Sequence, residues 1–255
     1  MKKVFFALYG GISYLTFLAA FLYAIGFVGN ILVPQSVDSG GLATPLVTAI
    51  IVNCLLLSVF AVQHSGMARK GFKKVLTTYF PSEMERSTYV LGTNAVLFLM
   101  FWQWRPMPEI VWSVEHSVGA AVLQAAFWAG WAIVLLSTVM INHFDLFGLR
   151  QTWLAVKGTA YTELGFRTPG FYGFVRHPIQ VGFLIAFWAT PTMTAGHLLF
   201  AVMTTGYIFL AVKLLEERDL MREHPERYGA YMEQVPGFVP RLTRPSKADQ
   251  PAVGE

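Results

Sequence analysis

Long apolar stretches separated by short polar segments dominate the chain. We identify six of them, at about 4–30, 43–63, 88–104, 117–141, 178–194 and 197–215. A bilayer core about 30 Å thick takes about 20 apolar residues per helix, and somewhat fewer where flanking side chains reach the interface. The pattern predicts an all-α fold, a polytopic membrane bundle with six transmembrane helices.

The fifth stretch is short, and Pro191 with Gly196 marks a tight turn into the sixth. We therefore expect these two stretches to form a C-terminal helical hairpin. In a five-span alternative, this hairpin dips into the membrane without crossing it.

Composition and charge support a membrane location. The chain is 55% hydrophobic and 13% charged, about half the charge of a soluble domain. With both termini in the cytoplasm, Arg105 is the only one of 19 Lys and Arg residues placed outside. The net charge of +4 then fits anionic lipid headgroups as partners and requires no nucleic acid.

The remaining segments form one predicted domain, 1–241, followed by a polar tail, 242–255, that we expect to be disordered. "GMARKGFKKVLTTYF" and "LFGLRQTWLAVKG" have helical amphipathic spacing and predict short helices at the cytoplasmic interface. After the sixth stretch, the helix is expected to break before Pro225 and restart there. Tyr228, Tyr231 and Val235 then share one face of a cytoplasmic C-terminal helix that "VPGFVP" ends.

Polar groups gather at the cytoplasmic leaflet of this topology, although each could also serve as an anchor or a satisfied interfacial side chain. Ionisable residues at membrane depth are a functional-site hypothesis by default. The group comprises Gln63, His64, Arg86, Asn142, His143, Asp145, Arg176, His177, Glu216 and Glu217.

The motifs in the chain narrow the chemistry. The sequence lacks HxxxH and HxxHH clusters, so no metal is expected, and it lacks GxSxG, HExxH, P-loop and Rossmann signatures. In "YGFVRHPIQVGFL", Pro178 suits the first position of a helix whose free N–H groups, beside Arg176 and His177, favour an anionic group. Gly182 permits close approach. Glu216 and Glu217 could meet an ammonium or ribose hydroxyls, which suggests S-adenosylmethionine as cofactor.

The C-terminal motifs resemble those of the isoprenylcysteine carboxyl methyltransferase superfamily. "RHPIQVG", "EERDL", "HPERYGAY" and "VPGFVP" follow its order over about residues 170–240, with Gln180 where the pattern often has Tyr. The resemblance implies that S-adenosylmethionine is held by His177, Pro178, Gly182, Glu216, Glu217, Tyr228 and Tyr231, with Arg176 adjacent.

The N-terminal motifs "QHSGMAR", "ERSTYVL" and "NHFDLFGLRQ" resemble those of bacterial methanethiol S-methyltransferases, which implies methylation of methanethiol to dimethyl sulfide. A thiol is mostly protonated at neutral pH, so the reaction needs a base or a nearby cation. His143, oriented by Asp145, and His64 are the candidate bases. Arg86 and Arg150 are the candidate cations that stabilise the thiolate.

Three alternatives remain at this point. A prenylcysteine or lipid methyltransferase would use the same cofactor with a larger acceptor. Membrane sterol reductases share a related pattern and would bind NADPH. A non-enzymatic protein could bind haem through the cytoplasmic-side histidines, or act as an accessory factor in nitrogen-oxide metabolism.

Overall fold

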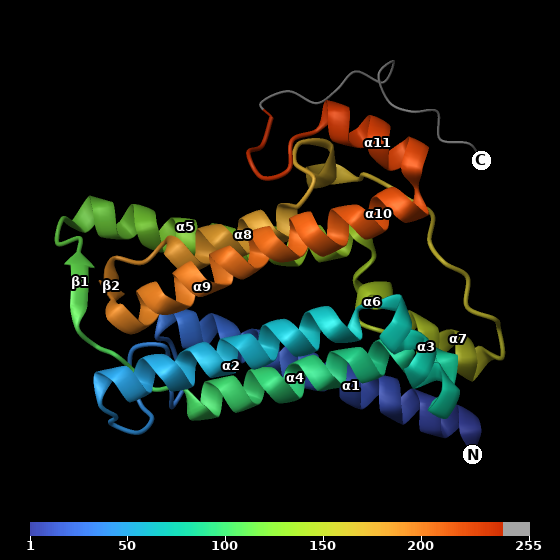
Figure 1. The fold of residues 1–255 in the computed structure, drawn as a ribbon, viewed down its shortest axis with the longest axis horizontal. Helices are drawn as coiled ribbons and strands as arrows, with labels where there is room; N and C mark the ends of the chain where they lie inside the picture. Colours follow the sequence, from blue (N-terminus) through green and yellow to red (C-terminus); the bar gives the residue numbers. More distant parts are fainter. Residues whose placement is uncertain (242–255) are drawn as a thin grey trace.

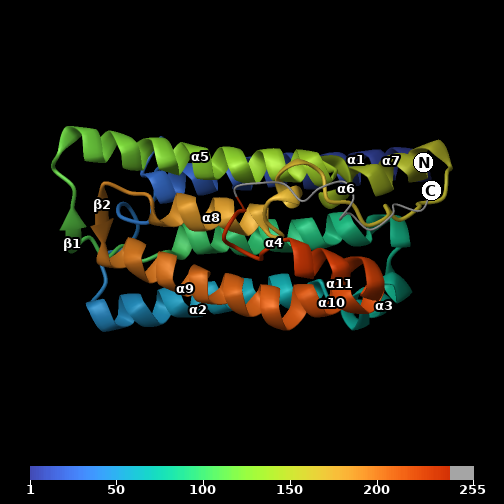
Figure 2. The ribbon, with the colours of Figure 1, turned by 90° about the horizontal axis from the view of Figure 1, so that it is seen from above.

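A computed structural model describes residues 1–241, and the tail 242–255 that we expected to be disordered lies outside them. The described chain is a bundle of helices in two layers (Figures 1 and 2). The bundle helices are α1 (Lys2–Gly29), α2 (Leu46–Met67), α4 (Glu85–Gln103), α5 (Ser117–Ile141), α8 (Pro178–Trp188) and α9 (Ala195–Ala211). α5, α8 and α9 form one layer and α1, α4 and α2 the other, and α2 packs against α9 where the layers meet.

Smaller elements complete the fold. They are α3 (Lys70–Tyr79), η1 (Ser82–Met84), α6 (His143–Leu146), α7 (Leu149–Lys157), η2 (Gly170–Gly173), η3 (Val212–Glu216), α10 (Glu217–Glu223) and α11 (Pro225–Gln234). The two short amphipathic helices predicted from the sequence are confirmed as α3 and α7. The predicted break before Pro225 is confirmed too, because α10 ends at Glu223 and α11 begins at Pro225.

Four helices of the described chain are long and apolar enough to cross a membrane: α1, α2, α5 and the continuous segment Ala195–Glu223. α4 lies between α1 and α2, and its 19 residues are less apolar. α8 has only 11 residues, about 16 Å at 1.5 Å per residue, or half of a bilayer core. The count of six spans therefore stays a prediction, and the expected fifth helix, 178–194, ends early at Trp188.

A two-stranded sheet is present that the all-α prediction missed. β1 (Ile110–Ser113) pairs antiparallel with β2 (Thr192–Thr194), with Ile110 opposite Thr194 and Ser113 opposite Thr192. Both strands are short and lie in connections between helices, so they produce little alternating pattern in the sequence. The sheet ties the α4–α5 connection to the α8–α9 connection.

Aromatic rings fill the centre of the bundle. Phe27, Phe101, Trp104, Trp131 and Phe200 belong to one buried cluster that joins both layers. α5 and α8 approach closely at Gly130 and Gly182, and a Cβ at Gly182 would lie 2.7 Å from the Gly130 carbonyl oxygen. The glycine pair therefore sets the spacing of these two helices.

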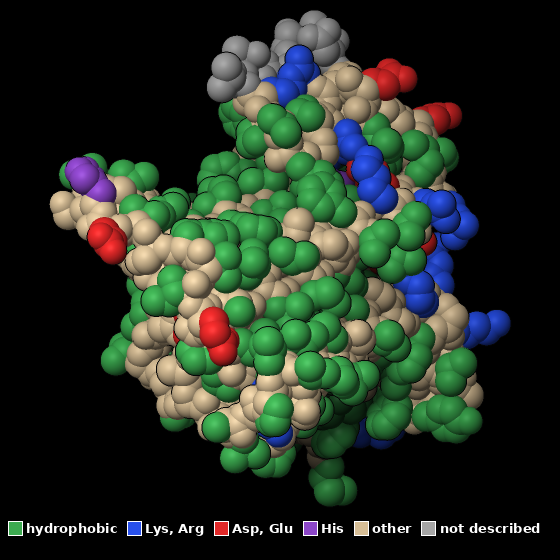
Figure 3. Space-filling view, turned by 60° about the vertical axis from the view of Figure 1, so that its left-hand side comes forward, with side chains coloured by type: hydrophobic (Ala, Val, Ile, Leu, Met, Phe, Trp, Pro, Cys, Tyr) green, Lys and Arg blue, Asp and Glu red, His purple; other side chains and the backbone are tan. Residues whose placement is uncertain are grey.

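The two ends of the bundle differ in charge. We call the end with the N-terminus, α3, α7, α10 and α11 the charged end, and the end with β1 and β2 the sheet end (Figure 1). In Figure 3, Lys and Arg side chains gather along one edge, while the face toward the viewer is mostly hydrophobic. The N-terminus and α11 lie at the same end, as the predicted topology requires.

Candidate active site

The start of α8 is built as the sequence predicts. Pro178 occupies the first helical position and His177 the N-cap. The backbone N–H groups of Arg176 and His177 donate to the carbonyl oxygens of Pro236 and Gly237, at 2.9 and 3.2 Å. The "VPGFVP" segment after α11 therefore holds this helix start in place.

Arg176 is buried within a network of protein groups. Its guanidinium donates to Glu217 Oε1 at 2.6 Å and to the carbonyl oxygens of Val235 and Met232 at 2.6 and 3.2 Å. The side chains of Arg176 and Glu217 are 7% and 8% exposed, so this is a buried ion pair. The Nε of Arg176 has no hydrogen-bond partner among the described residues. The predicted partner of Arg176 was an anionic ligand, yet the chain itself supplies a carboxylate.

His177 joins both glutamates. Its Nε2 lies 3.2 Å from Glu217 Oε1 and its Nδ1 lies 3.5 Å from Glu216 Oε1, while the ring of Phe238 lies 5.5 Å from its own. Gln180 donates to Glu216 Oε2 at 3.0 Å. The Glu216 side chain is 44% exposed, in contrast to Glu217. Glu216 is thus oriented by two neighbours while keeping an open face.

A π-helical turn, η3, interrupts the helix that carries the glutamates. It spans Val212–Glu216 between α9 and α10, and Lys213 contacts Glu217 at 3.3 Å. Single π turns are uncommon inside helices and are frequent at functional sites. Composition and periodicity carry no signal for this turn, so the sequence did not predict it.

The C-terminal tyrosines lie behind this network. Tyr228 and Tyr231 are buried with Val235 against Phe166, which confirms their predicted common face. The Tyr231 hydroxyl donates to the Tyr172 carbonyl oxygen at 2.6 Å. The Tyr228 hydroxyl is buried beside the Arg176 guanidinium. Burial, and then the Glu217 charge, raise the pKa of Tyr228 to about 12, so it remains a neutral hydroxyl.

Glu216 connects this network to α2. The Glu216 carboxylate lies within electrostatic range of His64, Tyr207 and Tyr172. His64 is held by the Tyr89 hydroxyl, 2.9 Å from Nε2, and stacks on Phe60 with ring centroids 5.2 Å apart. His64 and Glu216, far apart in the sequence, are therefore close enough in the fold to interact electrostatically.

His143 lies in a separate cage against α1. Its Nδ1 and Nε2 are each 2.8 Å from a hydroxyl, of Thr138 and Tyr14 respectively. The Thr138 hydroxyl donates its proton to the Leu135 carbonyl oxygen at 2.7 Å, so it must accept from Nδ1–H. Nε2 of the neutral ring then accepts from Tyr14. Burial lowers the pKa of His143, which favours this neutral form.

The expected contact between Asp145 and His143 is wrong. Asp145 Oδ1 instead accepts from Arg150 at 2.9 Å, and Arg150 also donates to the Thr162 carbonyl oxygen at 2.8 Å.

Arg86, the other predicted cation, differs from Arg150 in having no such partner among the described residues. Its side chain has no ion pair or hydrogen bond within residues 1–241, and its Nε is buried. Of the two predicted thiolate-stabilising cations, Arg86 is the one left available.

Gly182 is placed by packing. Because it faces Gly130 of α5 at backbone distance, its close approach is to a helix. The predicted close approach at Gly182 is present, and the group that approaches it is the backbone of α5.

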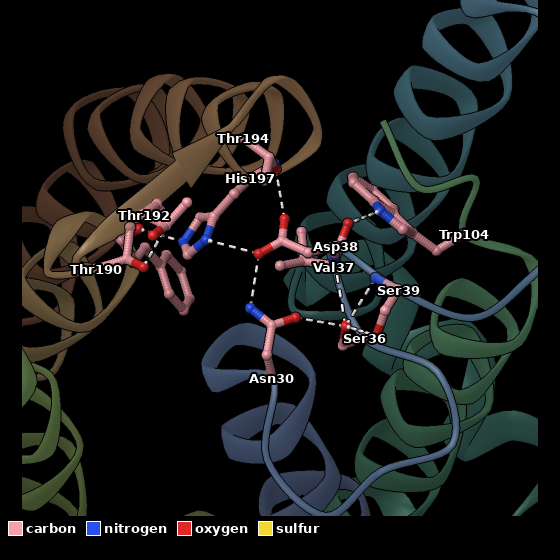
Figure 4. A network of polar contacts seen from close by, with 11 residues as sticks. Asn30, Ser36, Val37, Asp38, Ser39, Trp104, Thr190, Thr192, Thr194 and His197 are labelled. Carbon is pink, nitrogen blue, oxygen red and sulfur yellow. Dashed lines mark hydrogen bonds and ion pairs between the residues drawn. The ribbon is translucent and has the colours of Figure 1, made fainter. Parts of the chain in front are cut away.

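A second polar network, at the sheet end, was not predicted (Figure 4). Asp38 Oδ2 accepts from Asn30 at 2.6 Å, Asp38 Oδ1 accepts from the Thr194 hydroxyl, and His197 Nδ1 lies 3.9 Å from Oδ2. His197 is buried, and its Nε2 lies 2.9 Å from the Phe187 carbonyl oxygen. A cavity of about 210 Å³ adjoins Asp38. The sequence did not reveal this network, because Asp38 stands alone in a loop and belongs to no recognisable motif.

Comparison with known proteins identifies the family. A methanethiol S-methyltransferase of Mycobacterium tuberculosis is 54% identical over 240 residues, covering 94% of this chain and 98% of that protein. The corresponding proteins of Crocosphaera subtropica and Bradyrhizobium diazoefficiens are 48% and 51% identical, over 96% and 95% of this chain. The chain belongs to the methanethiol S-methyltransferase family.

More distant similarity reaches beyond the methanethiol S-methyltransferases. Nurim of Danio rerio is 30% identical over 174 residues, which cover 65% of this chain and 63% of Nurim. No protein-family model and no solved structure matches the chain. The resemblance suggested by the N-terminal motifs is thus confirmed over nearly the whole sequence.

Proposed function

We propose that this protein transfers a methyl group from S-adenosylmethionine to methanethiol, forming dimethyl sulfide, at the cytoplasmic side of the membrane. The observation that carries the proposal is the 48–54% identity to methanethiol S-methyltransferases over almost the full chain. The gathering of Arg176, His177, Glu216 and Glu217 around one helix start supports it.

The residues present suit S-adenosylmethionine. Glu216, oriented and half open, offers a carboxylate for an ammonium or ribose hydroxyls. Arg176 Nε is a buried donor with no hydrogen-bond partner among the described residues, a state that costs free energy unless a ligand or water satisfies it. His177, Pro178, Glu217 and Tyr231 would shape this site, and Gly182 would set the helix spacing beneath it.

The cofactor would supply an electrophilic methyl group on a positively charged sulfur. The chain must deliver a thiolate in line with it, and the two opposite charges disappear as the new carbon–sulfur bond forms. Alignment of the two sulfurs contributes to the rate. A site of low polarity favours this loss of charge relative to water, because the reactants are more strongly solvated than the products.

We assign His64 as the base and Arg86 as the cation that stabilises the thiolate. The electrostatic interaction of His64 with Glu216, one of the candidate cofactor residues, supports this assignment. His143, with both ring nitrogens engaged, is better suited to fixing α6 against α1. Arg150 and Asp145 neutralise each other beside it.

The proposal is tested by incubating the purified protein with S-adenosylmethionine and methanethiol and measuring dimethyl sulfide in the headspace. We expect product that depends on both substrates. Binding of S-adenosylmethionine without dimethyl sulfide would refute the thiol acceptor, and methylation of prenylcysteine analogues alone would favour the alternative methyltransferase.

A further inference from the structure

A small cavity lies between α2 and α9, close to His64. Its volume is about 70 Å³, and the lining is mostly apolar, formed by Leu57, Ser58, Phe60, Ala61, Met203, Thr204 and Tyr207. Figures 1 and 2 show the two helices side by side along one flank of the bundle. We call this cavity the α2–α9 pocket.

One aromatic ring, that of Phe60, lies between the α2–α9 pocket and the candidate base. Phe60 stacks on His64, and the edge of Tyr207 meets Phe60 with ring centroids 5.9 Å apart. The Tyr207 hydroxyl lies 2.9 Å from the Ser65 hydroxyl, which fixes the ring across the gap between the helices. Phe60 therefore lines the pocket on one side and contacts His64 on the other.

The size of the α2–α9 pocket restricts its occupant. On a comparable measure a cavity needs about 10–15 Å³ to hold one water, so the α2–α9 pocket has room for only a few groups of that size. A methyl group joined to a sulfur meets this limit, whereas a prenyl chain is far larger. The apolar lining suits a neutral thiol, which would lose its proton only on reaching His64, beyond Phe60.

The α2–α9 pocket also faces outward. Ser58 and Met203 are exposed at the surface of helices that are both long and apolar enough to span a membrane. A small apolar molecule dissolved in the bilayer would meet the pocket there without crossing the charged end. Ionic S-adenosylmethionine, by contrast, suits the polar residues around Glu216.

We infer that the α2–α9 pocket is the entry site of the acceptor, which takes a short alkanethiol from the bilayer and holds it behind Phe60, the ring that stacks on His64. This assignment rests on the proposed function and adds to it the route and the size limit of the acceptor. Met203 and Ala61 set the length of thiol that fits, and Phe60 with Tyr207 separates the pocket from the cofactor side.

The test compares methanethiol, ethanethiol and 1-propanethiol as acceptors for two variants. Met203→Ala enlarges the pocket and should raise the ratio of ethanethiol to methanethiol kcat/KM by about 10-fold, within the range that one methylene commands in an apolar pocket. Ala61→Leu fills it and should raise the methanethiol KM by about 10-fold. Val202→Ala and Val62→Leu are matched controls on exposed neighbours outside the lining, and should behave as wild type.

Binding of S-adenosylmethionine, measured by calorimetry, shows that each variant is folded. Unchanged acceptor profiles in both pocket variants, with wild-type methylation of methanethiol, would overturn the pocket and leave the proposed function standing. A wild-type protein that methylates no thiol would overturn both. An equal shift in the Val202→Ala control would also contradict the pocket, because that side chain does not line it.

Discussion

The charged end holds a buried carboxylate beside a histidine and the sheet end a partly buried one, yet the two ends differ in what they leave open. At the sheet end, Asn30 and Thr194 donate to Asp38, and the network joins a loop to the start of α9. At the charged end, Glu217 is similarly enclosed by Arg176, but Glu216 next to it stays half exposed. The larger of the two described cavities lies at the sheet end, so volume alone does not mark the active site.

The comparison separates a structural role from a functional one. A carboxylate that protein donors satisfy, as Asn30 and Thr194 do for Asp38, rigidifies the fold. Among the described residues each end has a buried nitrogen without a hydrogen-bond partner, Arg176 Nε and His197 Nδ1, so the half-exposed Glu216 carboxylate is the feature that gives the charged end capacity for a ligand. We therefore assign fold stability to the sheet end, and cofactor binding to the charged end, and the following predictions test this division.

The largest effect is expected from the candidate base. His64→Ala should lower kcat by about 10²- to 10⁴-fold, the usual contribution of general base catalysis. His116→Ala removes an exposed histidine at the sheet end and should leave kcat unchanged. Headspace dimethyl sulfide measures both. If His143→Ala, and not His64→Ala, abolished turnover, the base assignment would be wrong.

Unpairing the buried cation at the charged end should cost stability. Glu217→Ala leaves Arg176 without its carboxylate and should lower the free energy of unfolding by about 3–5 kcal/mol. Asp219→Ala breaks the more exposed pair with Arg69 and should cost about 1 kcal/mol or less. Denaturant unfolding in detergent compares the two variants, and equal losses would contradict burial as the cause.

The sheet end should affect stability alone. Asp38→Asn weakens its bonds to Asn30 and Thr194 and should lower the free energy of unfolding by about 1–3 kcal/mol. Turnover per folded molecule should stay at the wild-type value, as in the exposed control Glu115→Gln. A loss of kcat in fully folded Asp38→Asn protein would show that the sheet end takes part in the chemistry, contrary to our assignment.

A small pH effect should come from His143. Burial lowers its pKa in the folded protein, so below about pH 6.5 the unfolded chain binds a proton that the folded chain resists. The associated stability is complete above this pH and is lost as the pH falls through the folded pKa. In thermal unfolding, His143→Gln should therefore lose less stability on acidification than wild type, whereas His116→Gln should match wild type.

The sequence could predict features that depend on local chemistry. Pro178 and Pro225 begin helices where their missing N–H groups cost nothing, and the apolar stretches correspond to helices. The sequence also predicted that the ionisable residues lie at one end of the bundle, because Lys and Arg collect on one side of a membrane.

Features that depend on tertiary partners could not be predicted. Arg176 pairs with Glu217 because "VPGFVP" folds back onto the start of α8, and Asp145 turns to Arg150 because α6 ends in a tight turn. The π turn before Glu217 and the pairing of β1 with β2 likewise depend on packing between distant segments.

The central claim is that the open carboxylate at the charged end binds the methyl donor. Titration of S-adenosylmethionine into wild type, Glu216→Gln and Asp38→Asn by calorimetry tests it directly. We predict that Glu216→Gln weakens binding by roughly 10- to 100-fold, the value of one charged hydrogen bond, and that Asp38→Asn binds as wild type. Wild-type affinity in Glu216→Gln together with lost affinity in folded Asp38→Asn would contradict the account.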